Sequence, residues 1–398
     1  MSELFPPLPK ETRLLLDRLP GLIEKVFPLP ARFRSKLPAD VAHLSQLLTS
    51  HRADLENSYL RKPALLSAYL RYFFPWNIYR LCRLCSALPL NLKAQDAIND
   101  IGSGPFTLAA SLWISKPSLR KLPLEFRCLD RTPAALEAGK LFFAALSAES
   151  GCKWTFRTIR GELKHNGRLS VEIKGKSAAL SAAVNIYNEL FWDFSPMDTE
   201  RLLQFSKNQA RLLSSITDSS GAILVVEPGI PRSGEFISLL RSFLMKEGRY
   251  PLSPCPHSGA CPIPGGKKGT GRKERWCHFA FDTEDAPLEL HKLSSASRLP
   301  KERAVLSFIF AGPMPGNSQE DYKVNNFPVR VISDSFPVNA VNKSNTHNWG
   351  RYGCSEPGLV LIKGSKQVLE KTPSGTLKNI TLKSNLRDLK SGAFIGEL

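Results

Sequence analysis

No apolar stretch of the 398-residue chain approaches the ~20 residues that a membrane-spanning helix needs, so a helical membrane protein is excluded. The N-terminus, MSELFPPLPKE, lacks the basic-then-apolar pattern of a secretory signal and the Arg-rich, acid-poor composition of a transit peptide. Ordinary apolar content with charges of both signs is typical of a globular protein. We therefore expect a soluble cytoplasmic protein that is large enough for two or three domains.

Acidic residues are few relative to basic ones: 36 Asp and Glu stand against 54 Lys and Arg, which gives a formal net charge of +18. A field of that size attracts phosphate-rich partners, because binding them releases counterions. Nucleic acid is the partner class that this charge favours. The alternative is a basic surface that binds nothing, since net charge alone specifies no partner.

A disulfide framework is not expected, because the eight cysteines occur without a secretion signal and so favour free thiols or metal ligands. Cys82 and Cys85 form a C-x-x-C pair in the amphipathic stretch YRLCRLCSAL, with no second such pair nearby. Buried free cysteine is a common small core residue, so we assign this pair to packing.

Three regions of different pattern follow one another, without internal repeats. Residues 1–92 carry apolar positions at helical spacing and predict an N-terminal helical region. In 93–316, short apolar runs such as AINDIGSG, LEFRCLD and AILVVEP alternate with helical patterns, which predicts a doubly wound, Rossmann-like α/β sheet. The runs CHFAFDTE and AVLSFIFAG would complete this sheet as an antiparallel pair. Residues 317–398 show short strand patterns and predict a small C-terminal β domain.

The segment DIGSGPFTLAASL places two glycines after a predicted strand and before a predicted helix. Gly102 and Gly104 allow a tight turn and a close approach to a ligand, and the helix that follows presents unpaired N–H groups. Asp130, at the end of the next strand, can accept hydrogen bonds from ribose hydroxyls. The turn lacks the full G-x-G-x-x-G of dinucleotide sites and the G-K-[ST] of a phosphate loop. It resembles motif I of the class I S-adenosylmethionine-dependent methyltransferases, which implies a cofactor site that includes Asp100 with these three residues.

Two further segments are candidates for the same site. By this resemblance Glu162, in RGEL after the third strand, faces the adenine; the alternative is a solvated loop carboxylate. Asn188 and Glu189, in NIYNEL, follow the fourth strand at the edge where open α/β sheets bind ligands. The chain lacks the Asn/Asp-Pro-Pro-aromatic motif of amino-directed methyltransferases and a suitably placed Pro-Cys nucleophile. The methyl acceptor is therefore unassigned, and catalysis itself is left open.

The loop at 250–278 is rich in Pro, Gly and Lys, and it holds three cysteines in C-x5-C-x15-C spacing, namely Cys255, Cys261 and Cys277. Clustered cysteines in an intracellular loop favour thiolate ligands over packing. A tetrahedral site needs a fourth ligand, for which His257, His278 and the distant Cys354 are candidates. Four thiolates accept zinc or an iron–sulfur cluster, so the spacing leaves the metal open.

The runs DIGSGPFTLA, NIYNEL, VVEPGIPRSGEF, PCPHSGACP and ERWCHF occur in this order between Asp100 and Gly312. In this combination the chain resembles the methyltransferase-like protein 17 family, mitochondrial small-ribosomal-subunit assembly factors with bacterial relatives. The resemblance implies a 4Fe-4S cluster, in preference to zinc, held by the three loop cysteines and by Cys354. It also implies S-adenosylmethionine binding, association with the rRNA and proteins of the small ribosomal subunit, and a mitochondrial location in a eukaryote.

Two interpretations follow from the resemblance. In the first, the protein is a cofactor-binding, methyltransferase-like factor that acts on rRNA; in the second, it is a non-catalytic RNA-binding assembly factor with this fold as scaffold. A radical-type S-adenosylmethionine enzyme is excluded, because its compact C-x3-C-x2-C motif does not occur. We expect a monomer without a membrane partner. The basic residues of the cysteine loop would face phosphates, unless they only keep the loop solvated; they are Lys267, Lys268, Arg272, Lys273 and Arg275.

Overall fold

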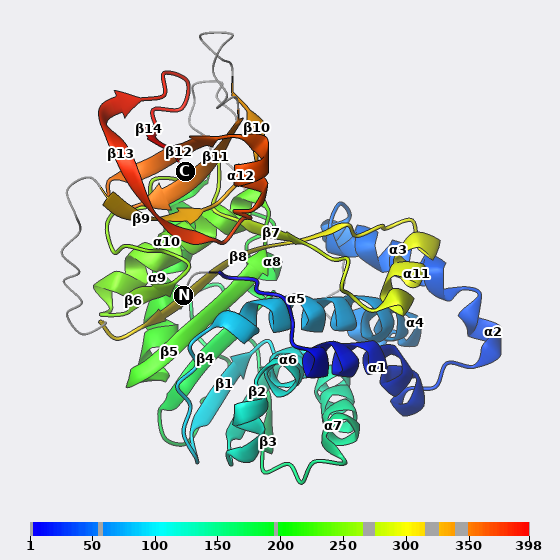
Figure 1. The fold of residues 1–398 in the computed structure, drawn as a ribbon. Coiled ribbons are helices and arrows are strands. Elements are labelled where there is room, and N and C mark those ends of the chain that lie inside the picture. Colours follow the sequence, from blue (N-terminus) through cyan, green and yellow to red (C-terminus); the bar gives the residue numbers. More distant parts are fainter. Residues whose placement is uncertain are drawn as a thin grey trace.

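The computed structural model describes residues 3–54, 59–194, 198–265, 275–314, 326–338 and 349–397. They form a large α/β body and a smaller barrel of strands that lies at one end of it (Figure 1). None of the helices in these ranges combines the length and the apolar character that crossing a membrane requires.

The N-terminal helical region that the apolar spacing predicts is present, whereas its limit at residue 92 stays a prediction. A continuous helical rod runs from Pro63 to Ala87 and contains a wider π-helical turn in its middle. Such turns are rare and often occur at functional sites. The elements of the region are α1 (Lys10–Val26), α2 (Ala31–Arg34), α3 (Leu37–Leu48), η1 (Arg52–Asp54), η2 (Tyr59–Arg61), α4 (Pro63–Ala68), η3 (Tyr69–Phe73) and α5 (Phe74–Ala87).

The predicted doubly wound sheet is confirmed. Its strands are β1 (Ala97–Ile101), β2 (Glu125–Asp130), β3 (Thr155–Arg160), β4 (Ala178–Val184), β5 (Thr217–Pro228), β6 (Tyr250–Ser253), β7 (Phe279–Asp282) and β8 (Arg303–Gly312). The order is β3-β2-β1-β4-β5-β8-β6, and the first five strands are parallel. Strand β8 is antiparallel to β5, β6 and β7, which confirms the predicted antiparallel pairing of the last two runs.

Helices cover both faces of the sheet, as parallel strands require. Along β5, Leu224 and Val226 face the core beneath α5, whereas Ile223 and Val225 face the core beneath α9 and α10. This alternation is that of a strand buried on both sides. The remaining helices of the body are α6 (Thr107–Ser115), η4 (Pro117–Lys121), α7 (Pro133–Ser147), α8 (Tyr187–Leu190), α9 (Thr199–Ser215), α10 (Pro231–Lys246) and α11 (Leu288–Ala296).

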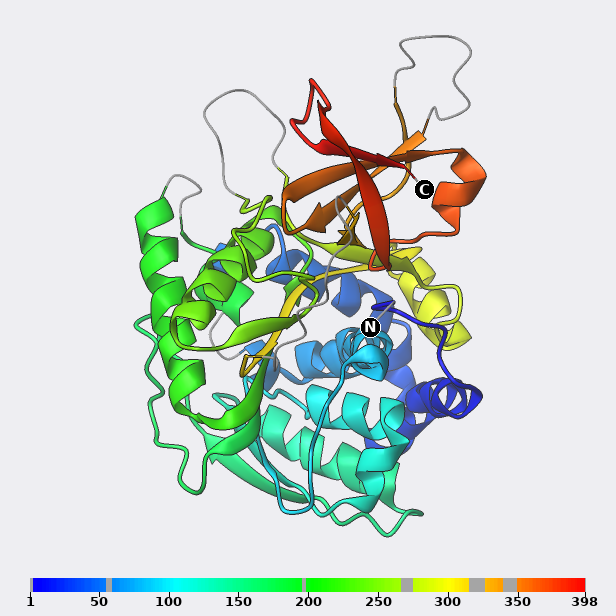
Figure 2. The ribbon, with the colours of Figure 1, turned by 60° about the vertical axis from the view of Figure 1, so that its left-hand side comes forward.

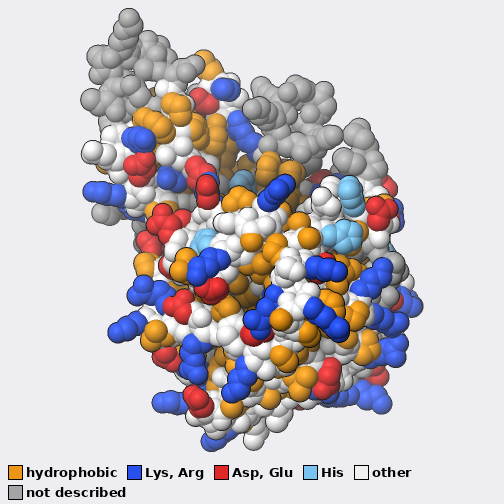
Figure 3. Space-filling model, turned by 90° about the vertical axis from the view of Figure 1, so that its right-hand side faces the viewer, with side chains coloured by type: hydrophobic (Ala, Val, Ile, Leu, Met, Phe, Trp, Pro, Cys, Tyr) orange, Lys and Arg blue, Asp and Glu red, His pale blue; other side chains and the backbone are white. Residues whose placement is uncertain are grey.

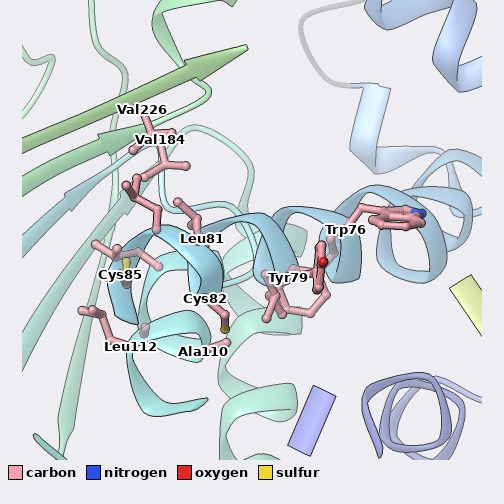
Figure 4. Packing of buried hydrophobic residues seen from close by; sticks show 14 of the residues in the cluster. Trp76, Tyr79, Leu81, Cys82, Cys85, Ala110, Leu112, Val184 and Val226 are labelled. Atoms are coloured by element: carbon pink, nitrogen blue, oxygen red, sulfur yellow. The ribbon is translucent and has the colours of Figure 1, made fainter. Parts of the chain in front are cut away.

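Helix α5 buries the C-x-x-C pair in the core. Cys82 and Cys85 are fully buried and lie among Ala110, Leu112 and the strand residue Val184 (Figure 4). Burial raises the pKa of the Cys82 thiol well above its usual range. The assignment of this pair to packing is therefore confirmed.

The predicted C-terminal β domain is a small closed barrel. Its elements are β9 (Asn326–Val331), β10 (Phe336–Pro337), β11 (Trp349–Ser355), β12 (Gly358–Gly364), α12 (Lys366–Glu370), β13 (Leu377–Arg387) and β14 (Phe394–Glu397). Strand β11 pairs with both β12 and β9, which closes the ring β9-β11-β12-β14-β13. Val329, Val331, Val360 and Ile362 are among the residues that fill its interior.

The barrel packs on the α/β body beside β7, and both ribbon views show this arrangement (Figure 2). The Arg330 Nε–H of β9 donates to the Pro254 carbonyl at 2.9 Å. The Ala280 N–H of β7 donates to Ser374 Oγ at 3.4 Å. The cysteine loop and the strand β7 therefore both contact the barrel directly.

A buried ion pair ties α5 to the segment after β7. The Arg83 side chain, 8% exposed, donates to both carboxylate oxygens of Asp285 at 2.8 and 2.9 Å. Its guanidinium also lies over the Phe281 ring and donates to the Phe5 carbonyl. Removal of the carboxylate would leave a buried cation without compensation.

We therefore expect Asp285→Ala to lower the free energy of unfolding by about 3 kcal/mol in urea denaturation. The matched control is Asp334→Ala, which breaks the ion pair with Arg303. In this pair the Arg303 side chain is 45% exposed and the Asp334 side chain is 58% exposed. This control should cost less than about 1 kcal/mol. Equal losses in the two variants would contradict the role assigned to the buried pair.

Candidate functional site

A cavity of about 90 Å³ opens at the carboxyl ends of β1 to β4, the edge where open α/β sheets bind ligands. Of the residues that the sequence predicts for the cofactor, five line it: Asp100, Gly102, Gly104, Asp130 and Glu162. The strand ends and the turns that follow them therefore bring these predicted residues to one place. Their assignment to a cofactor stays a prediction.

The two glycines of the turn serve different purposes. Gly102 has φ +71°, and a Cβ there would lie 2.5 Å from Ile186 Cδ1, so its lack of a side chain makes room for the end of β4. Gly104 has φ +52°, and the nearest atom to an added Cβ is Tyr69 Oη at 3.9 Å. A side chain at Gly104 would therefore enter the cavity, whereas hydrogen leaves the backbone open to a ligand.

Two carboxyl groups lie at this turn, a buried one at Asp100 and a half-buried one at Asp130. Asp130 accepts the Gly104 N–H at 2.9 Å and the Thr132 N–H at 2.8 Å, so it fixes the glycine turn directly. Burial, and then the charge of Asp130, raises the pKa of Asp100 to about 8. Asp100 Oδ2 is buried and has no hydrogen-bond partner among the described residues. Such an orphaned acceptor is a natural partner for a donor or a cation brought by a ligand.

Residues after the third and fourth strands are placed less uniformly. Glu162 is exposed and lines the cavity, so neither the adenine interpretation nor the solvated one is overturned. Asn188 is not among the lining residues; its N–H donates to Glu227 Oε2 at 3.0 Å, and its carbonyl accepts Arg52. Its neighbour Glu189 lines the cavity instead and pairs with Arg131 at 3.3 Å. Of these two neighbours, Glu189 therefore lies where a bound cofactor would contact it, and Asn188 does not.

Several lining residues come from the N-terminal helical region, and no local sequence pattern indicates them: Tyr59, Leu60, Tyr69 and Asn77. Tyr69 is the first residue of the π-helical turn. Glu227, at the end of β5, was also missed. It is fully buried, accepts the N–H groups of Tyr187 and Asn188, and burial raises its pKa to about 8. Its position in EPG, at the end of a predicted strand, could have indicated it in the same way as Asp130.

The four predicted metal ligands converge at the junction of body and barrel. Burial raises the pKa of the Cys277 thiol well above its usual range, and negative charge on Cys261, Cys255 or Cys354 raises that pKa further. Charge on Cys255 and Cys261 acts in the same way on Cys354. The loop and β11 therefore bring the four thiols within electrostatic reach of one another.

The two histidine alternatives differ in position. His257 Nε2 lies 3.2 Å from Cys354 Sγ, so this imidazole belongs to the same group of side chains. His278 instead stacks on Trp276, with centroids 4.8 Å apart. Within the described ranges, no group of three or more His, Cys, Asp or Glu side chains is arranged to hold a metal ion. The four cysteines therefore stay predicted ligands.

Two buried arginines border the cysteines. Arg241 of α10 is 2% exposed and donates to the carbonyls of His257 and Gly259 at 2.8 and 2.9 Å, which fixes the loop. Arg330 of β9 is 4% exposed, and burial lowers its pKa to about 10. Burial raises the pKa of the Cys255 and Cys354 thiols, and the charges of both arginines oppose that rise. The two arginines would therefore stabilise thiolates at this junction relative to an uncharged environment.

Positive charge is spread over the surface rather than confined to one segment, and Figure 3 shows Lys and Arg side chains scattered across one face. Of the basic loop residues, Lys267, Lys268, Arg272 and Lys273 lie outside the described residues. Arg275 is described, is exposed, and lies over the Tyr352 ring of β11 at 4.8 Å.

Comparison with curated proteins found no match. Solved structures with similar folds include S-adenosylmethionine-dependent methyltransferases from Thiobacillus denitrificans and from Geobacter sulfurreducens, each in complex with S-adenosyl-L-homocysteine. The first is 13% identical, with a TM-score of 0.31 over 60% of this chain and 91% of that one; the second is 10% identical, with 0.32 over 68% and 98%. A precorrin-6y C5,15-methyltransferase from Geobacter metallireducens is 11% identical, with 0.30 over 60% and 87%. Likenesses this distant carry no argument about function.

The decisive comparison is with sequence families. The family model described as "Mitochondrial small ribosomal subunit Rsm22" matches residues 98–338, which is more than half of the chain. The matched region includes the glycine turn, the strand ends around the cavity and the three loop cysteines. It agrees with the resemblance that the ordered motifs predict. The chain therefore belongs to the mitochondrial small ribosomal subunit Rsm22 family.

Proposed function

We propose that this protein is an S-adenosylmethionine-binding, methyltransferase-like factor that carries a 4Fe-4S cluster and acts on the small ribosomal subunit through its rRNA. The observation that carries the proposal is the cavity at the carboxyl ends of β1 to β4, with an open glycine turn and the carboxyl groups of Asp100 and Asp130. The family description supplies the ribosomal partner, and the net charge of +18 supports a partner rich in phosphate.

The residues of the cavity suit a nucleoside cofactor with a cationic centre. Gly104 leaves room beside the backbone, and Asp130 keeps lone pairs for ribose hydroxyls after it has accepted two N–H groups. The orphaned oxygen of Asp100 can form a hydrogen bond with a polar group of the cofactor. S-adenosylmethionine, when bound, would supply an activated methyl group; these residues would bind and orient it.

The cysteine junction suits an anionic metal centre. Four thiolates can hold a zinc ion or an iron–sulfur cluster, and the described side chains form no group arranged to hold a metal ion. The resemblance to the methyltransferase-like protein 17 family, rather than the geometry, is what favours the 4Fe-4S cluster. Arg241 and Arg330 would offset its negative charge.

A second candidate function is that of a non-catalytic assembly factor. Two of the four carboxylates that line the cavity have structural partners: Asp130 binds two backbone N–H groups, and Glu189 pairs with Arg131. The sequence also lacks a recognisable acceptor motif. In this interpretation, bound cofactor stabilises the fold, and the protein contributes by holding RNA.

Gly104→Val should abolish S-adenosylmethionine binding in calorimetry, because its side chain would enter the cavity. Gly151→Val is the matched control: Gly151 also has positive φ, +59°, but nothing lies within 4 Å of an added Cβ. Asp130→Asn should weaken binding roughly ten- to a hundredfold through loss of a charge-assisted hydrogen bond. If wild-type protein binds no cofactor, the catalytic proposal fails and the assembly factor survives.

Anaerobically purified protein should be brown and should contain iron and sulfide, and both should be lost in Cys255→Ser, Cys261→Ser, Cys277→Ser and Cys354→Ser. Cys152→Ser, a half-buried thiol away from the junction, is the control. His257→Ala tests the alternative fourth ligand, since this ring touches Cys354. Stoichiometric zinc without sulfide would refute the cluster. Loss of iron in His257→Ala, with iron retained in Cys354→Ser, would make His257 the fourth ligand in place of Cys354.

Labelled methyl groups from S-adenosylmethionine should be transferred to immature small subunits by wild-type protein, and not by Gly104→Val. The subunits are isolated from cells that lack the protein. If no label is transferred, but both proteins restore subunit maturation, the factor is non-catalytic and the cofactor is dispensable for it.

A further inference from the structure

The C-terminal barrel has a recognisable strand plan. Its five strands in chain order are β9, β11, β12, β13 and β14, and around the ring the order is first, second, third, fifth, fourth and back to first. The third and fifth strands, β12 and β14, are parallel, and all other pairs of the ring are antiparallel. Helix α12 lies between the third and fourth strands in sequence. This is the Greek-key plan of the OB-fold, which binds oligonucleotides and oligosaccharides across its second and third strands.

The register of β11 and β12 shows which side chains lie on that face. Gly353 and Val360 are opposite one another, and Val360 fills the barrel interior. By alternation, the outer face carries the pairs Tyr352 with Leu361 and Cys354 with Leu359. Lys363 lies opposite Gly350 on the same face, and Gly350 also pairs with Phe336 of β10.

One end of this outer face is buried by the body, and the other end is partly exposed. Cys354 is buried against His257 of the cysteine loop, and Leu359 packs against the body core. Tyr352 packs against the same core, yet it is only half-buried, as are Phe336 and Lys363. The partly exposed end is thus the part of the face that a ligand could reach.

Two aromatic rings and two cations lie at this end of the outer face. The Tyr352 and Phe336 rings are 5.0 Å apart at 35°, and the Arg275 guanidinium lies 4.8 Å from the centre of the Tyr352 ring. Lys363 adds a second cation from the third strand. Rings that stack bases, combined with cations that contact phosphates, are how proteins bind single-stranded nucleic acid.

We propose that the outer face of β10, β11 and β12 binds single-stranded RNA, with an unpaired base on the Tyr352 ring and phosphates at Arg275 and Lys363. The inference rests on the proposed function for the class of partner, and it names the surface that this partner contacts. A neutral oligosaccharide would use the ring but would gain nothing from the two cations, so the charge selects RNA.

The site is built next to the cysteine junction. Arg275 is two residues from Cys277, and Tyr352 is two residues from Cys354, on the same outer face. A centre that holds both cysteines fixes the loop that supplies the cation relative to the strand that supplies the ring. RNA binding at this face therefore depends on an intact junction.

The test is fluorescence anisotropy of full-length protein with a labelled single-stranded oligoribonucleotide of about 12 nucleotides, and with its duplex. Tyr352→Leu removes the ring but keeps an apolar side chain, and it should weaken single-strand binding roughly five- to a hundredfold. Tyr352→Phe should bind like wild type. The double variant Arg275→Ala with Lys363→Ala should weaken binding and reduce the slope of log affinity against log salt by about 1.4.

The control double variant Lys371→Ala with Lys378→Ala removes two exposed charges elsewhere on the barrel and should leave most of the affinity and slope in place. If wild-type protein binds neither strand nor duplex, the RNA partner of the proposed function is wrong. Another outcome is that the protein binds single strands while Tyr352→Leu and the double variant of Arg275 and Lys363 keep the affinity of the control variants. In that case the RNA binds elsewhere, and this inference is wrong. Preference for duplex would also overturn it. Equal thermal melting of the variants shows that folding is intact, and the double variant tests the face should Tyr352→Leu fail to fold.

Discussion

A parallel sheet has two apolar faces, and both must be covered before a site can form at its edge. Here α5 and α6 cover one face, and α9 and α10 cover the other. The same helices supply residues to both candidate sites. The rod that ends in α5 brings Tyr69 and Asn77 to the cavity, and α10 brings Arg241 to the cysteine loop. Shielding the sheet and building the sites are thus one structural task, and each site inherits the rigidity of the core behind it.

The sheet, the glycine turn and the cavity carboxylates at Asp100 and Asp130 could be predicted because each depends on a short stretch of sequence. A strand, a turn with positive φ and a carboxylate at a strand end leave local patterns. Orientation was not predictable: Asn188 and Glu189 are neighbours, yet successive residues of a helix point about 100° apart, and only Glu189 reaches the cavity. The N-terminal residues of the cavity, such as Tyr59, could not be predicted either, since tertiary packing alone brings them there.

The cysteine junction shows the same division between local and distant information. The spacing of three cysteines in one loop predicts them as a group, whereas Cys354 is placed by the register of β11 against β12 and β9. Arg241 and Arg330 could not be predicted from the sequence, because tertiary packing brings them from α10 and β9 to the thiols, where both are buried. Their charges oppose the rise that burial causes in the pKa of Cys255 and of Cys354. The thiolate form itself is implied by the motif and not by burial.

The position of those two arginines also bears on how the barrel is held. Arg330 belongs to the barrel and donates to Pro254 of the loop, while Arg241 belongs to the body and donates to His257 and Gly259. In the proposed function, an anionic centre between them would attract both parts, so the free energy of forming the metal centre would also be free energy of docking the barrel. Under the same proposal, the surface around β11 would be complete only with the centre in place, so RNA binding there would depend on the cysteines rather than on the cofactor cavity.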